Sequence, residues 1–176
     1  MKTQTYESIA ARLGDAELAD VVCCALAEMF DHEALCRGDI DGPHEFCVVY
    51  SVYMTTGLIG GDGLDSLEAN DSTSFYLACL VALEHSILAN RLKRFFDGSE
   101  VSDDERRKLE RLMPTQADRL ILAIGRFMRS RPDVFSSLLS RIQSTLVYLS
   151  IFDPESYQEK MNTPGPDTQG LREHFG

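Results

Sequence analysis

Apolar residues recur every three to four positions along most of the chain, which is the period of an amphipathic α-helix. The pattern is clearest from Asp15 to Phe30, where apolar positions share one side at about 100° of rotation per residue. It predicts a helix with its N-cap at Asp15, after Gly14 ends a short first helix. The predicted core side consists of Leu18, Ala19, Val22, Cys23, Leu26, Met29 and Phe30, which leaves Cys24 near solvent.

The segment from Phe46 to Met54 gives two conflicting signals. Its β-branched and aromatic residues favour a strand by propensity. Its aromatic and apolar residues also form a helical stripe, and the preceding Gly42-Pro43 is a suitable helix entry. We therefore expect a helix here.

The stretch from Ser72 to Phe96 is predicted to be one long helix that ends at Asp97-Gly98. Its first half, FYLACLVAL, is apolar around the whole circumference. A helix with that composition is normally buried on all sides. The sequence therefore predicts that this helix lies at the centre of the fold.

The second half of the chain is divided by prolines. Ser102-Asp103-Asp104-Glu105 is a capping box for a helix expected to stop before Pro114. A helix from Thr115 to Ser130 and another from Pro132 to about Phe152 should follow, and the polar residues after Tyr157 should be loosely held. The predicted fold is all-α, a single compact orthogonal bundle of about six to eight helices around a buried central helix, with one domain over residues 1–157 and a tail over 158–176.

Composition fits a single domain that needs neither disulfides nor metal for its stability. The 176 residues are 44% apolar, enough for a core. The five cysteines are an odd number with no C-x-x-C pair, which favours a reduced cytoplasm. The longest apolar run, Phe75 to Leu83, is too short to span a bilayer, and the first residues lack the pattern of a secretory signal.

Charge narrows the class of partner. The net charge is −11, so direct binding to nucleic acid is disfavoured and a basic protein is the expected partner. Residues 1–90 carry 3 basic and 15 acidic side chains, whereas residues 91–141 carry 12 basic and 8 acidic ones. Opposite charge on the two halves also leads us to expect a homodimer.

The sequence offers only weak evidence for a catalytic site. The glycines from Gly57 to Gly63 lack the Lys-Ser/Thr ending of a phosphate loop, and no cofactor is expected. Metal-binding residue types do gather in the first third of the chain, but without a paired ligand motif. The alternative function is therefore a small metal- or thiol-dependent enzyme with a site around Glu28, His32, Cys36, His44 and Cys47.

The segment GDGLDSLEAN, residues 61–70, resembles the N-G-G-F-x-x-Y/F-x-x-N signature of a bacterial helical family of unknown function typified by an acidic DNA mimic. Ala82 to Ala89 is similar to an A-L-x-x-I-G-like stretch that follows in that family. Gly63 is suited to a turn with positive φ, and Asn70 to the cap of the next helix. The matching positions, Gly61, Gly63, Leu64, Leu67 and Asn70, are therefore interpreted as structural.

The resemblance implies an all-helical, non-enzymatic protein that occupies the DNA-binding surface of a regulator or nuclease. The carboxylates suited to this role are Glu17, Asp20, Glu28 and Asp31, helped by Glu68 and Asp71. Carboxylates one helical turn apart, about 5 Å, can imitate a sparse row of phosphates for the Arg and Lys groups of a DNA-binding protein. The alternative is that these acids only keep the helix soluble.

Overall fold

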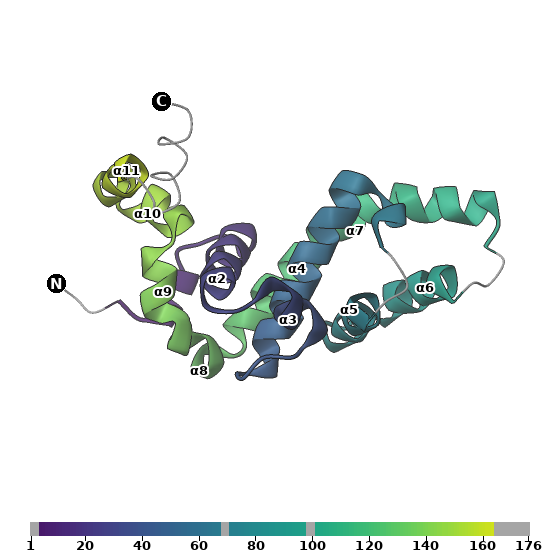
Figure 1. The fold of residues 1–176 in the computed structure, drawn as a ribbon, viewed down its shortest axis with the longest axis horizontal. Coiled ribbons are helices and arrows are strands. Elements are labelled where there is room, and N and C mark those ends of the chain that lie inside the picture. The colour runs from purple at the N-terminus through teal and green to yellow at the C-terminus, as the bar shows by residue number, and fades with distance from the viewer. Residues whose placement is uncertain (1–3, 68–70, 98–100, 164–176) are drawn as a thin grey trace, which may run out of the picture.

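The computed structural model describes residues 4–67, 71–97 and 101–163. Across these residues the chain forms α-helices and two short 3₁₀ helices and contains no strand, so the all-α prediction is confirmed (Figure 1). The helices outnumber the predicted six to eight because several are short. They are α1 (Tyr6–Ala10), α2 (Asp15–Met29), α3 (His32–Arg37), α4 (His44–Asp62), η1 (Leu64–Ser66), α5 (Asp71–Ala82), α6 (Ser86–Phe96), α7 (Asp103–Arg129), α8 (Pro132–Phe135), η2 (Ser136–Leu138), α9 (Leu139–Ser144), α10 (Leu146–Phe152) and α11 (Pro154–Asn162).

The buried central helix is α4, which contacts α2, α3, α5 and α7 (Figure 1). Cys47, Val49 and Val52 of this helix are completely buried. The helical prediction for the segment from Phe46 to Met54 is thus confirmed. In an all-α environment its β-branched and aromatic side chains fill the core instead of pairing in a sheet.

The prediction that one central helix runs from Ser72 to Phe96 is wrong. The chain turns at Glu84, whose φ of 66° is left-handed, and this turn separates α5 from α6. The His85 N–H donates to the Leu80 carbonyl at 2.8 Å, as in a helix C-terminal motif that usually contains glycine. Val81 is 53% exposed, so α5 is not buried all round.

The side chains of α2 divide as predicted, with the expected apolar residues buried from Leu18 to Leu26. Cys23 is buried and Cys24 is half-buried, as expected. Met29 is 40% exposed, because the helix ends there and no longer faces the core. The N-cap is Gly14, one residue earlier than predicted, and its N–H donates to Glu17 Oε2 at 2.8 Å.

The capping box at Ser102 is confirmed, but the predicted stop before Pro114 is wrong. Helix α7 continues through Pro114 to Arg129 and changes direction along its length (Figure 1). Proline removes one backbone donor and leaves the carbonyl four residues earlier without its helical partner. Pro114 is exposed, where water can satisfy that carbonyl, so the helix bends without ending.

The predicted helix from Pro132 to Phe152 is divided into α8, η2, α9 and α10. Helix α11 then extends past Tyr157 to Asn162 without a buried residue. The rest of the predicted tail, residues 164–176, lies outside the described residues. Among the described helices, none is both long and apolar enough to cross a membrane.

Candidate functional site

The four predicted acids of the first third of the chain lie on the outer side of α2 and at the start of α3. We call Glu17, Asp20, Glu28 and Asp31 the acidic face. Glu17, Glu28 and Asp31 are exposed, and Asp20 is half-buried. The opposite side of α2 is fixed in the core, where Leu18, Val22 and Leu26 are completely buried. The backbone that carries three of these carboxylates is therefore held rigidly.

Three of the four carboxylates are also oriented by a hydrogen bond. Glu17 accepts from the Gly14 N–H at 2.8 Å, and Asp31 accepts from the Ala34 N–H at 3.0 Å as the N-cap of α3. Asp20 accepts from the Tyr53 hydroxyl. A carboxylate has two oxygens and about four acceptor sites, so each of these groups keeps acceptor capacity for a further donor.

The structure changes the predicted geometry in one respect. Helix α2 ends at Met29, so Asp31 belongs to α3 and does not continue the helical spacing of Glu17, Asp20 and Glu28. Asp71 is the first residue of α5 and lines a groove between α5 and α6. Glu68 lies outside the described residues.

Some of the acidic residues of the first half form ion pairs with basic residues of the second half. Arg129 pairs with Asp15 at 3.0 Å, and Arg131 pairs with Glu45 at 3.8 Å. Arg106 is also paired with an acid of the first half, Asp65. None of these acids belongs to the acidic face, and in the described part of the chain no ion pair involves the acidic face. The homodimer stays a prediction.

The residues of the alternative enzyme site are only partly brought together. His32 Nε2 lies 4.0 Å from Cys36 Sγ, and its Nδ1 lies 3.1 Å from the Tyr50 hydroxyl. His44 packs instead against the ring of Phe75. In the described residues no group of three or more His, Cys, Asp or Glu is placed to hold a metal ion.

The cysteine thiols of this region are not activated. Burial raises the pKa of the Cys36 thiol, and it raises the pKa of the Cys47 thiol to about 11. A raised pKa keeps the protonated thiol, which is the less nucleophilic form. The metal- or thiol-dependent enzyme stays a prediction without a supporting group of reactive residues.

The turn that carries the family-like motif has the predicted structural character. Gly63 ends α4 with a φ of 80°, a conformation that favours glycine. Leu64 and Leu67 are buried, while a side chain at Gly61 would meet open space. Asn70, the predicted cap, lies outside the described residues.

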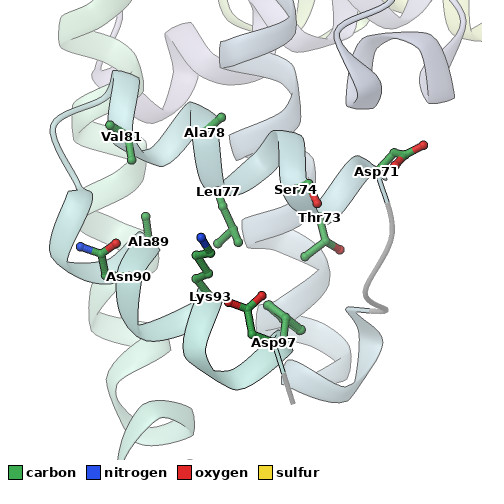
Figure 2. A pocket seen from close by; sticks show the side chains of 11 residues that line it. Asp71, Thr73, Ser74, Leu77, Ala78, Val81, Ala89, Asn90, Lys93 and Asp97 are labelled. Carbon is green, nitrogen blue, oxygen red and sulfur yellow. The ribbon is translucent and has the colours of Figure 1, made fainter. Parts of the chain in front are cut away.

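A groove of about 620 Å³ lies between α5 and α6 (Figure 2). Leu77 and Val81 of α5 face Ala89 and Lys93 of α6 across it. Asp71, at the start of α5, and Asp97, the C-cap of α6, also line the groove. The sequence pattern does not predict this groove, because it joins the two helices into one. The sequence does contain one sign that the predicted long helix is divided in two. The residues after Leu83 are charged and polar, in contrast with the apolar run before it.

Comparison of the chain with protein-family models, curated proteins and solved structures finds no match. The resemblance of residues 61–70 to the helical family stays a prediction.

Proposed function

We propose that this protein is an acidic, non-enzymatic binding protein that occupies the nucleic-acid-binding surface of a basic partner, such as a regulator or a nuclease. One observation carries the proposal. On the acidic face, hydrogen bonds fix the orientation of Glu17, Asp20 and Asp31, and within the described residues none of the four carboxylates forms an ion pair.

The spacing of these carboxylates suits a phosphate-binding surface. Glu17 and Asp20 are separated by about 4.5 Å along the axis of α2, and Asp20 and Glu28 by about 12 Å, at about 1.5 Å per residue. Phosphates of one DNA strand follow each other at about 3.4 Å along the duplex axis. The two separations therefore lie between one and four times the axial distance between neighbouring phosphates. Arg and Lys side chains that are spaced to bind the phosphates of a DNA strand can thus reach Glu17, Asp20 and Glu28.

Acidic residues near the acidic face in the sequence add to its negative electrostatic potential. Residues 15–62 contain ten acidic side chains and one basic one, Arg37. Three of these acids are in ion pairs, Glu33 with Arg37, Asp15 with Arg129 and Glu45 with Arg131, and the other seven leave an excess of negative charge. An excess of one charge across a surface raises the association rate of an oppositely charged partner. Preorganised carboxylates also lose less side-chain entropy when a partner binds.

The proposal is tested by substitution of the four carboxylates with their neutral amides. The variant Glu17→Gln, Asp20→Asn, Glu28→Gln, Asp31→Asn keeps a hydrogen-bond acceptor at each position, so the caps at Gly14 and Ala34 and the contact with Tyr53 can persist. The protein is immobilised, incubated with extract of the cell that makes it, and washed at rising salt. We expect a basic, DNA-binding protein to be retained by the wild type at low salt and lost at high salt, because salt screens exposed charges.

A matched control removes four charges elsewhere. Glu7, Asp118, Glu155 and Glu159 are exposed acids outside the acidic face and without an ion pair in the described part of the chain, and their amide variant has the same net charge as the test variant. The acidic-face variant should lose the partner while the control retains it. If both variants lose the partner equally, overall charge and not the acidic face is responsible.

A further inference from the structure

A small cavity of about 230 Å³ lies between α3, α4 and the start of α5, and three side chains with soft or borderline metal-binding atoms line it. These are His32 and Cys36 of α3 and Met54 of α4. Cys36 is 8% exposed and Met54 is 36% exposed, so both sulfur atoms belong to residues at the edge of the core and not deep within it.

His32 and Cys36 are one helical turn apart and point toward each other. The distance from His32 Nε2 to Cys36 Sγ is 4.0 Å. On the other side of the ring, His32 Nδ1 is 3.1 Å from the Tyr50 hydroxyl. In the tautomer that donates Nδ1–H to Tyr50, Nε2 directs its lone pair toward Cys36 Sγ. A histidine that ligates a metal is typically held in this way, by a hydrogen bond from its other ring nitrogen.

The nitrogen–sulfur distance allows one metal ion to bind both atoms. With metal–sulfur and metal–nitrogen bonds of about 2.3 and about 2.0 Å, a tetrahedral ion would place the two atoms about 3.5 Å apart, a trigonal ion about 3.7 Å and a linear ion about 4.3 Å. The observed 4.0 Å lies between the trigonal and linear values. A relative movement of at most about 0.5 Å would therefore bring both atoms onto one ion in any of these geometries.

The donor set selects the class of metal. Thiolate and thioether ligands favour Cu(I), and imidazole also binds copper. Cu(I) accepts two or three ligands, and His32, Cys36 and Met54 supply that number in the lining of this cavity. Glu33, which is paired with Arg37, lines the same cavity. Residues 15–62 contain ten acidic side chains and one basic one, and this excess attracts a cation to the region.

We propose that His32 and Cys36, with Met54 as a weaker third ligand, form a binding site for one soft monovalent metal ion of the Cu(I) class. On binding, the Cys36 S–H bond breaks, its proton passes to solvent and a sulfur–copper bond forms, with no change in oxidation state. The site shares no residue with the acidic face, although Asp31 is the N-cap of the helix that carries His32 and Cys36, and it does not depend on the proposed function.

The test is a titration of the reduced full-length protein with Cu(I) under anaerobic conditions, in competition with a chromophoric Cu(I) chelator. We expect one Cu(I) per chain in the wild type. Cys36→Ser should lose this binding, His32→Gln should weaken it at least tenfold, and Met54→Leu, which keeps the volume of the side chain, should weaken it several-fold. Cys24→Ser is the matched control, because Cys24 is a half-buried thiol on α2 that does not line the cavity, and it should bind as the wild type does.

Two results would overturn the site. One is Cu(I) binding that is unchanged in Cys36→Ser, or unchanged in both His32→Gln and Met54→Leu. The other comes from X-ray absorption of the copper-loaded wild type, which does not depend on how any variant folds. Nitrogen and sulfur neighbours together are expected, and a shell of sulfur alone would assign the copper to a group of cysteines and exclude His32.

Discussion

Gly125 of α7 is the position where the packing account can be tested most sharply. A Cβ added there would lie 2.6 Å from both Cβ and Cγ of Asp15, the first residue of α2. Atoms at that separation overlap, so one of the two helices must move. Rotation of the Asp15 side chain cannot relieve the overlap, because Asp15 Cβ is attached directly to the backbone of α2.

The same shift would weaken a partly buried group of hydrogen bonds around Arg129. Asp15 accepts from Arg129 Nε at 3.1 Å, and Arg129 also donates to the carbonyl oxygens of Ala10 and Leu13, which connects α1 and α2 to α7. Overpacking of a core costs about 1–3 kcal/mol, and a hydrogen bond to a charged group is worth about 1.5–3 kcal/mol. The gain in helix propensity from glycine to alanine is about 1 kcal/mol. With the hydrogen bond lost, we expect Gly125→Ala to lower the free energy of unfolding by about 1.5–5 kcal/mol in total, or the melting temperature by roughly 3–20 °C for a chain of this size.

Gly57 of α4 provides the control. It also lies inside a helix, but a Cβ added there meets nothing within 4 Å. Gly57→Ala should therefore raise the free energy of unfolding by about 0.5–1 kcal/mol. Urea unfolding followed by circular dichroism at 222 nm measures both variants. If Gly125→Ala is as stable as the wild type while Gly57→Ala is stabilised, the close approach of α7 and α2 is incorrect.

Two further substitutions test local features. Gly38 ends α3 with a φ of 76°, and a Cβ there would lie 2.5 Å from the ring of Phe75. Gly38→Ala should therefore lower the free energy of unfolding, measured in urea, by at least the left-handed backbone strain of about 1–2 kcal/mol. A variant as stable as the wild type would contradict this. Burial, with a smaller contribution from the charge of Arg119, lowers the pKa of His85 below its usual 6.5. The unfolded chain therefore binds the proton more readily than the folded protein, and the folded protein loses stability as the pH falls below about 6.5. His85→Gln should reduce that loss in unfolding curves measured between pH 7 and pH 5, and an identical pH dependence in the variant would refute the assignment.

The features predicted correctly from the sequence are those that depend on local spacing. The three-to-four-residue period places Leu18, Val22 and Leu26 on the core side of α2, and this holds because one helix face decides their burial. The capping box at Ser102 is recognisable for the same reason, since all its atoms lie within four residues. The separation of Cys23 from Cys24 follows from the same helical rotation.

The features that the sequence did not reveal depend on tertiary context. A left-handed turn is expected at glycine, so the residue type of Glu84 does not indicate a turn, and the change to polar composition after Leu83 was the one available signal. Pro114 is expected to end a helix, but the packing of α7 against α2 and α4 keeps it continuous. In the alternative enzyme site, the i, i+4 spacing of His32 and Cys36 is enough to predict their contact. The contact of His32 with Tyr50 is not predictable in this way, because the two residues are 18 positions apart and meet only through the packing of α3 on α4.

The measurement that tests the proposed function most directly is displacement of DNA from the partner retained on the immobilised protein. The partner is bound to fluorescent duplex DNA and titrated with the wild type, with the acidic-face variant, and with the control variant that lacks Glu7, Asp118, Glu155 and Glu159. We predict that the wild type and the control release the DNA at similar concentrations, that the acidic-face variant needs a several-fold or higher concentration, and that added salt weakens displacement. Equal displacement by the acidic-face variant and the wild type would contradict the proposal.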